Sequence, residues 1–272
     1  MKRILKIGMD VHTTNYTLCA MEPIIGEDDR VFATIKVTPD YKNILMFIEN
    51  LKLKLGLNDE YDIQCGYEAG CLGYSLYNQL IAAGVKCVIL APTTMLTPQG
   101  VRIKTDMRDA YMIAQCLSYG GYHAVYIPTE DDDSVKEYLR MRNDHKIALK
   151  KIKQQINAFC IRHGFCYDGT KWTMTHLKWL KKLETRNAIY RETLNEYMAS
   201  YEEQEAKVER YDKRIEEMAK QEKYHVKVKK LECFLGIKTH TALSLIVETG
   251  DFERFAKGNQ YASYLGLAPG EN

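Results

Sequence analysis

Apolar positions in the first 130 residues follow two alternating patterns. Short runs rich in aliphatic and β-branched residues predict strands at 3–10, 15–21, 31–37, 61–67 and 85–91. Apolar residues that recur every three or four positions predict helices at 41–55, 72–83 and 106–119. Because strands alternate with helices, we expect an α/β domain over residues 1–130, with a mixed sheet that has parallel members and helices on its faces.

A purely helical period replaces this alternation from Ser134 onward. Ser134 and Glu137 have the spacing of a capping box, which predicts that a basic helix starts there and that 131–133 is a solvated linker. A second helix carries a heptad seam at Tyr190, Leu194, Tyr197, Tyr201, Gln204, Val208, Tyr211, Ile215 and Met218. The seam fits two alternatives, an intramolecular hairpin with residues 134–163 or a coiled coil between two copies of the chain.

The change of period divides the chain into three predicted segments. They are the α/β domain 1–130, a helical coiled-coil segment 131–230, and a mostly helical unit that begins at 231 and runs to 272. No apolar run approaches the roughly 20 residues of a membrane helix. The N-terminal run is cut by charged residues, unlike a signal peptide, and the eight Cys form no CxxC pair. We therefore expect a cytoplasmic protein with reduced thiols.

The net charge of +2 conceals an uneven distribution along the chain. Residues 134–186 hold 13 Lys and Arg against 4 Asp and Glu, whereas both flanking regions are acidic overall. Such a concentrated basic stretch predicts a surface for DNA or RNA, although a Lys-rich helix can also be a solvated face. The candidate nucleic-acid contacts are Arg102, Lys104, Arg140, Arg142, Lys146, Lys150, Lys151 and Lys153.

Four carboxylates stand where predicted elements begin or end. Asp10 and Glu68 close two strands, and Asp106 and Asp109 open a helix from one face. Singly, each residue could be a turn former, a solvated loop residue or a helix cap. Together they would repel one another unless a hard cation such as Mg²⁺ or Mn²⁺ lay between them, so all four are candidate metal ligands and catalytic residues. His12 is near in sequence, but we expect it to be a surface or core residue.

The quoted residues belong to longer motifs. These are Gly8-Met-Asp10-Val-His12, Tyr67-Glu68-Ala-Gly70, Lys104-Thr-Asp106-Met-Arg-Asp109-Ala110, Phe234-Leu-Gly236-Ile, Glu248-Thr-Gly250-Asp251 and Tyr264-Leu-Gly266-Leu-Ala-Pro269. In this order they resemble the motifs of the DEDD-type insertion-sequence transposases of the IS110 family, which are related to the pilin-gene invertase. One departure is Lys238, where the family usually has Gly.

The resemblance implies a RuvC-like domain of the RNase H type that binds Mg²⁺ through the four carboxylates. It also implies a DNA recombinase that a structured guide ("bridge") RNA directs, assembled as a dimer or tetramer through the helical segment and associated with the nucleoid. The family's nucleophilic Ser follows the Leu-Ala-Pro stretch, and none lies within this sequence, which ends at Asn272. On that basis we expect a C-terminally truncated transposase, impaired in strand transfer.

Two other interpretations remain open at this point. A RuvC-like endonuclease or junction resolvase would hydrolyse DNA with water and two metal ions, and so would need no Ser. A non-catalytic copy could instead dimerise through the seam, occupy DNA or RNA, and inhibit active transposase.

Overall fold

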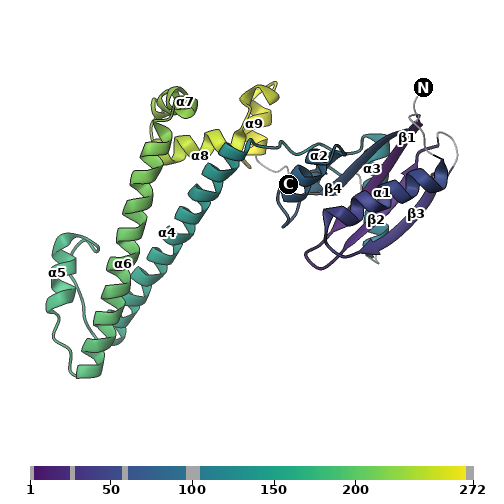
Figure 1. Cartoon of the computed structure of the whole chain (residues 1–272). Coiled ribbons are helices and arrows are strands. Elements are labelled where there is room, and N and C mark those ends of the chain that lie inside the picture. Colours follow the sequence, from purple (N-terminus) through teal and green to yellow (C-terminus); the bar gives the residue numbers. More distant parts are fainter. Residues whose placement is uncertain (1–2, 25–27, 57–60, 96–104, 268–272) are drawn as a thin grey trace, which may run out of the picture. The chain divides into compact units, whose positions relative to one another are not determined.

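The computed structural model describes residues 3–24, 28–56, 61–95 and 105–267. The chain divides into two compact units, Met1–Ile127 and Pro128–Asn272. The first contains the sheet and the second is built from helices, so the coarse expectation of an α/β N-terminal part and a helical remainder is confirmed (Figure 1). In the described part of the chain, no helix is both long enough and apolar enough to span a membrane.

The N-terminal unit is a five-stranded mixed sheet. Its strands are β1 (Arg3–Val11), β2 (Tyr16–Glu22), β3 (Arg30–Val37), β4 (Tyr61–Glu68) and β5 (Lys86–Leu90). They are ordered β3-β2-β1-β4-β5. Antiparallel pairing joins β1 to β2 and β2 to β3, whereas β1, β4 and β5 run parallel. All five predicted strands are present, each within a residue or so of its predicted ends.

One face of this sheet packs on α1 (Tyr41–Leu55) and α2 (Ser75–Ala82). Leu5, Ile7 and Met9 alternate along β1 and lie in this core, each fully buried. The side chain of Asp40 caps α1, and Gly56 ends it in the left-handed conformation with φ 57°. The second helix is shorter than predicted, because residues 71–74 form a turn before it begins. A 3₁₀ turn, η1 (Pro92–Thr94), follows β5.

The opposite face is covered by α3 (Asp106–Tyr119), which begins and ends where the sequence predicts. A Cβ atom at Gly8 would lie 2.1 Å from the carbonyl oxygen of Ala110 and 2.3 Å from the amide nitrogen of Ala114. These distances are far below van der Waals contact, so only glycine lets the helix backbone approach β1 this closely. The start of α3 is thereby fixed over the end of β1.

The second unit is entirely helical within its described residues. Its elements are α4 (Glu130–Arg162), α5 (Met174–Lys182), α6 (Ala188–Ala219), α7 (Glu222–Glu232), α8 (Thr239–Thr249), η2 (Phe252–Arg254) and α9 (Gly258–Tyr264). The predicted start of the basic helix at Ser134 is wrong. Thr129 caps α4, its hydroxyl accepting from the Asp132 amide at 3.2 Å, and residues 131–133 form the first helical turn. Acidic side chains stabilise that position because they face the positive end of the helix dipole.

Helices α4 and α6 pack side by side, and the seam supplies the contact (Figure 1). Leu194, Tyr201, Gln204, Val208 and Ile215 are buried. The Gln204 amide donates to the His145 carbonyl oxygen at 2.9 Å, so the polar seam residue is satisfied within the chain. These contacts agree with the intramolecular alternative. The α5 helix between them was not predicted.

A second core in this unit joins the first turns of α4 to the end of α6, to α7 and to α8. Its members include Leu139, Ile215, Tyr224 and Leu243, all buried. Residues after 231 therefore share their core with the helices that precede them. All eight cysteines have free thiols in the structure, and five of them are buried.

Candidate functional site

Strand register places a row of polar residues at one end of the sheet. Asp10 on β1 pairs with Thr17 on β2, and Thr17 pairs with Lys36 on β3. Directly paired residues point to the same face, and Asp10 shares its face with Gly8, two residues earlier. The row therefore lies on the face that α3 covers. On the other side of β1, the register with β4 ends at the pair Met9 and Tyr67, and Glu68 is the next and last residue of β4.

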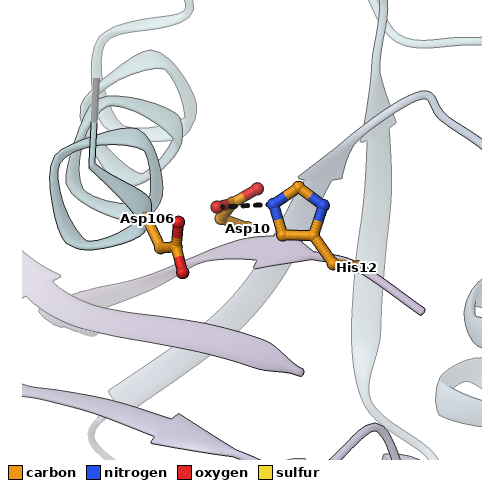
Figure 2. A group of neighbouring side chains, drawn as sticks. All are labelled: Asp10, His12 and Asp106. Carbon is orange, nitrogen blue, oxygen red and sulfur yellow. Dashed lines mark hydrogen bonds and ion pairs between the residues drawn. The ribbon is translucent and has the colours of Figure 1, made fainter. Parts of the chain in front are cut away.

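The N-terminus of α3 brings a second carboxylate to Asp10. Thr105 caps this helix, its side chain accepting from the Arg108 amide, so that Asp106 is the first helical residue. Because Ala110, one turn later, rests on Gly8, Asp106 comes down near the end of β1. Asp10, His12 and Asp106 each offer a ligand atom within 4.8 Å of the other two, and their side chains converge in Figure 2.

Two side chains, His12 and Lys36, contact the carboxylates of this cluster. The Nε2 atom of His12 lies 3.2 Å from Oδ2 of Asp10, and Nζ of Lys36 lies 2.7 Å from Oδ2 of Asp106. The Asp10 side chain is only 16% exposed, against 40% for Asp106 and 54% for His12. Solvent therefore reaches the cluster at Asp106 and His12, whereas the Asp10 side chain is largely buried.

The two aspartates differ in their electrostatic surroundings. Burial raises the pKa of Asp10, the negative charges of Asp109 and Asp106 raise it further, and His12 opposes them. Asp106 has a lowered pKa because Lys36 donates a hydrogen bond to it and holds a positive charge beside it. Asp10 is therefore a carboxylate that a nearby cation would stabilise strongly.

The structure brings together some of the predicted site residues but not all of them. Asp10 and Asp106 lie in one cluster, and Asp109 is close enough to Asp10 to affect its pKa. Among the described residues, the group within 4.8 Å includes neither Asp109 nor Glu68, and the Glu68 side chain is exposed. Their service as ligands stays a prediction.

Two residues of the cluster were missed as site residues by the sequence interpretation. His12 was expected on the surface or in the core, and it is exposed at the surface, but it also contacts Asp10; its position two residues along the same chain segment was the available signal. Lys36 contacts Asp106 from 70 residues away in sequence, and only the strand register reveals this contact.

The carboxylate oxygens of this cluster are suitable ligands for a divalent cation. Two carboxylates with a solvent-open side supply the ligands that Mg²⁺ and Mn²⁺ prefer, and an imidazole is acceptable to Mn²⁺. A further sign is the Thr17 hydroxyl, which is fully buried and has no hydrogen-bond partner among the described residues. A buried polar atom beside Asp10 without a partner is the kind of group that an ion's water ligand would satisfy.

The predicted nucleic-acid contacts have different environments. Arg142 forms two hydrogen bonds with Asp212 on α6, at 2.7 and 3.0 Å, and Arg140 pairs with Glu248 on α8 at 3.1 and 3.2 Å. Lys153 lies over the Trp172 ring, 5.2 Å from its centroid. Lys146, Lys150 and Lys151 are exposed and have no ion pair within the described ranges. Arg102 and Lys104 lie outside the described residues.

Comparison with known proteins adds to this geometry. A family model for DEDD transposases of the IS110 type matches residues 7–160, more than half of the chain. A second model, for transposases of the IS116/IS110/IS902 family, matches residues 228–272. The transposase of the insertion sequence element IS1533 from Leptospira borgpetersenii is 34% identical over 262 residues, which cover 95% of this chain and 73% of the relative. The y4qE protein of Sinorhizobium fredii is 32% identical over 206 residues, covering 75% of this chain and 50% of that protein.

Among solved structures, Thermus thermophilus RuvC matches 44% of this chain and 99% of its own, at 12% identity and a TM-score of 0.31. The identification rests on sequence: the family models and the IS1533 relative show that the protein is a transposase, an enzyme that acts on DNA. More particularly, the chain belongs to the IS110 family of DEDD transposases.

Proposed function

We propose that this chain provides the metal-binding and nucleic-acid-binding parts of an RNA-guided transposase, with an N-terminal domain of the RuvC or RNase H type. The observation that carries the proposal is the convergence of Asp10, His12 and Asp106 in a chain of the DEDD family. The reaction would be Mg²⁺-dependent or Mn²⁺-dependent DNA strand cleavage and exchange.

The residues of the site divide into different tasks. The Asp10 and Asp106 oxygens would hold the ion, with Glu68 and Asp109 completing its surroundings from β4 and α3. When bound, the ion would act as a Lewis acid on a DNA phosphate and on the attacking and leaving oxygens. The buried Thr17 hydroxyl would hold a water molecule beside Asp10, and His12 would orient the Asp10 carboxylate through its 3.2 Å contact.

The metal assignment is tested by removing the two convergent charges. We expect the double variant Asp10→Asn and Asp106→Asn to lose the heat of Mn²⁺ binding in calorimetry, because an amide is a much weaker ligand for a hard cation than a carboxylate. Asp62→Asn is the matched control, since Asp62 is an exposed strand carboxylate paired with Lys86 at the other end of the sheet. If the double variant has a normal circular dichroism spectrum and still binds Mn²⁺ as the parent does, the metal assignment is wrong.

Nucleic acid would meet the exposed lysines of α4. Lys146 and Lys150 are four residues apart and so project from one side of the helix, and Lys151 is their neighbour. Arg140 and Arg142 have carboxylate partners within the unit, which supports giving them a structural role and the lysines the phosphate contacts. Of the eight residues predicted to contact nucleic acid, the proposal thus assigns phosphate contacts to these three lysines of α4.

A triple lysine variant tests this surface. We expect Gln at positions 146, 150 and 151 to weaken duplex binding and to lower the salt slope of log K by about 0.9 for each lost phosphate contact. The control variant has Gln at the exposed Lys213, Lys227 and Lys230, and so removes the same charge elsewhere in the unit. Equal losses in both variants would mean that net charge, and not this face, governs binding.

Guide RNA and assembly are further parts of the proposal. The same lysine face would suit RNA phosphates, because counterion release does not depend on base sequence.

A dimer or tetramer would use the outer side of the helical unit, where Ile189 is 67% exposed beside Tyr190. Sedimentation equilibrium checks this part, and a monomer at every concentration, with RNA and without it, would contradict it. The resemblance places the strand-transfer Ser after Leu267-Ala-Pro269, so that step is not assigned to a residue described here.

A further inference from the structure

A cation from the protein already contacts one of the candidate metal ligands. Lys36 reaches Asp106 from β3, with Nζ 2.7 Å from Oδ2, and its side chain is 52% exposed. In the sheet, β2 separates β3 from β1, so the lysine stands two strands away from Asp10 and extends over Thr17 towards the start of α3. Lys36 is not part of the family motifs quoted above, and its contact with Asp106 depends on the strand register and on the position of α3 over β1.

The position of Lys36 conflicts with that of a divalent cation. Its ammonium uses Oδ2 of Asp106, and Asp106 also has an atom within 4.8 Å of ligand atoms from Asp10 and His12. An ammonium and a divalent ion that share a carboxylate would stand a few ångströms apart, where like charges repel. The hydrogen bond from Lys36 and its positive charge also lower the pKa of Asp106.

We propose that Lys36 is the resident counterion of Asp106 in the metal-free protein and that a divalent metal ion displaces it on binding. Lys36 thereby holds the Asp106 side chain in place, and it weakens metal binding by competing for the carboxylate. Once displaced, its ammonium lies free at the solvent-exposed side of the site. This inference rests on the proposed metal site and adds a residue that sets the affinity of that site.

A second ion pair in the same sheet provides a matched reference. Lys86 Nζ lies 2.7 Å from Oδ1 of Asp62, and the two side chains are 67% and 45% exposed. Both pairs thus have the same distance and join exposed groups on neighbouring elements. Asp62, however, pairs in register with Ile4 near the start of β1, six residues before Asp10, so Lys86 lies at the end of the sheet away from the site.

Mn²⁺ titration of the whole chain, followed by calorimetry, tests the competition. We expect Lys36→Gln to bind Mn²⁺ about three- to fivefold more tightly than the parent chain, the range set by the strength of an exposed ion pair. Lys36→Arg keeps the charge and should bind as the parent does, and Lys86→Gln should also leave the dissociation constant unchanged. An unchanged or weaker affinity in Lys36→Gln would overturn the inference, as would an equal gain in Lys86→Gln.

A direct readout follows the lysine itself. With the lysine side chains labelled with ¹³C, Mg²⁺ titration should shift the Lys36 signal, assigned from its loss in Lys36→Arg, and leave that of Lys86 in place. A stationary Lys36 signal at saturating Mg²⁺ would show that the pair persists and would refute displacement.

The metal site and the counterion role of Lys36 can be refuted separately. If the parent chain binds no Mn²⁺, or if Asp10→Asn with Asp106→Asn binds it equally well, the proposed metal site is wrong. If Mn²⁺ binding depends on both aspartates but not on Lys36, the site stands and only the counterion role is lost.

Discussion

Charged side chains serve opposite purposes in the two units of this protein. In the N-terminal unit, carboxylates of like charge gather at one end of the sheet, where burial and then the negative charges of Asp109 and Asp106 raise the pKa of Asp10. In the helical unit, charges of opposite sign meet one to one across helices, as in Arg142 with Asp212 and Arg140 with Glu248. Grouped like charges indicate a site for a ligand, whereas matched pairs indicate architecture.

The means by which each unit fixes these charges also differ. The acidic cluster depends on a contact between backbones, with α3 resting on Gly8, and no flexible side chain separates the two. The ion pairs of the helical unit depend on side chains, which can relax when a neighbour is changed. A substitution that changes a side chain by a similar volume should therefore lower the free energy of unfolding much more in the first unit than in the second.

The largest effect is expected from Gly8→Ala. A methyl group there would overlap the backbone of α3 at 2.1 and 2.3 Å, so the helix must move away or the unit must unfold. We expect a loss of at least about 3 kcal/mol in the free energy of unfolding, together with loss of Mn²⁺ binding. Circular dichroism in urea measures the first effect, and labelling of the buried Cys65 thiol reports on this unit alone.

Gly70→Ala is the control for this substitution. A Cβ at Gly70 would meet only the Glu68 carbonyl oxygen, at 3.9 Å, which is an ordinary contact. Its stability should match that of the parent chain to within about 0.5 kcal/mol. If the two alanine variants behave alike, backbone approach does not set the position of α3, and the contrast between the units is lost.

An intermediate effect is expected from Arg142→Ala in the helical unit. The Arg142 side chain is only 14% exposed, and its removal leaves Asp212 without its bidentate partner. We expect a loss of about 1–3 kcal/mol, measured by urea unfolding. Arg140→Ala, at a side chain that is 53% exposed, should cost about 0–1 kcal/mol. A larger loss from Arg140 than from Arg142 would contradict the assignment of Arg142 as the structural pair.

The smallest effect is expected to be a dependence of the stability of the helical unit on pH. His176 is buried and accepts a hydrogen bond from the Trp172 amide at 3.1 Å, and its pKa is lowered by burial and by the charge of Lys171. Its neutral form is therefore favoured in the folded state. Stability should be complete above pH 6.5 and should fall as the pH drops below that value, by at most about 1.4 kcal/mol per pH unit.

Tryptophan fluorescence measures this dependence in one unit, because Trp172 and Trp179 are the only two tryptophans of the chain. In His176→Asn, the amide oxygen can replace the ring acceptor without titrating, so the slope between pH 5 and pH 6.5 should flatten. A slope that is the same in both proteins would assign the pH dependence to another group.

Much of the first unit could be predicted because its strands and helices have clear local signals. Asp40 and Gly56 mark both ends of α1, and the start of α3 at Asp106 follows from Thr105 and the acidic first turn. The pairing of Lys36 with Asp106 could not be predicted, because it depends on which strand lies beside which and in what register.

The helical unit shows the limits of periodicity in another way. The seam from Tyr190 to Met218 was correctly placed on one helix, yet a period cannot reveal whether its partner lies in the same chain. The error at Ser134 arose because two capping patterns overlap there, and Thr129 with the acidic turn after it forms the cap observed. Charge counting marked residues 134–186 as basic, but it could not separate Arg142, which is paired, from Lys146, which is exposed.

The contact between Gly8 and α3 also sets an order of events during synthesis. Asp10 is among the first residues to leave the ribosome, whereas the helix that completes its surroundings is made about 100 residues later, which takes roughly 5–20 s at the usual rate of elongation. Until then, Asp10 stands on an uncovered face of a growing sheet. The nascent chain therefore passes through a period in which it holds Asp10 without Asp106, the other carboxylate of the cluster.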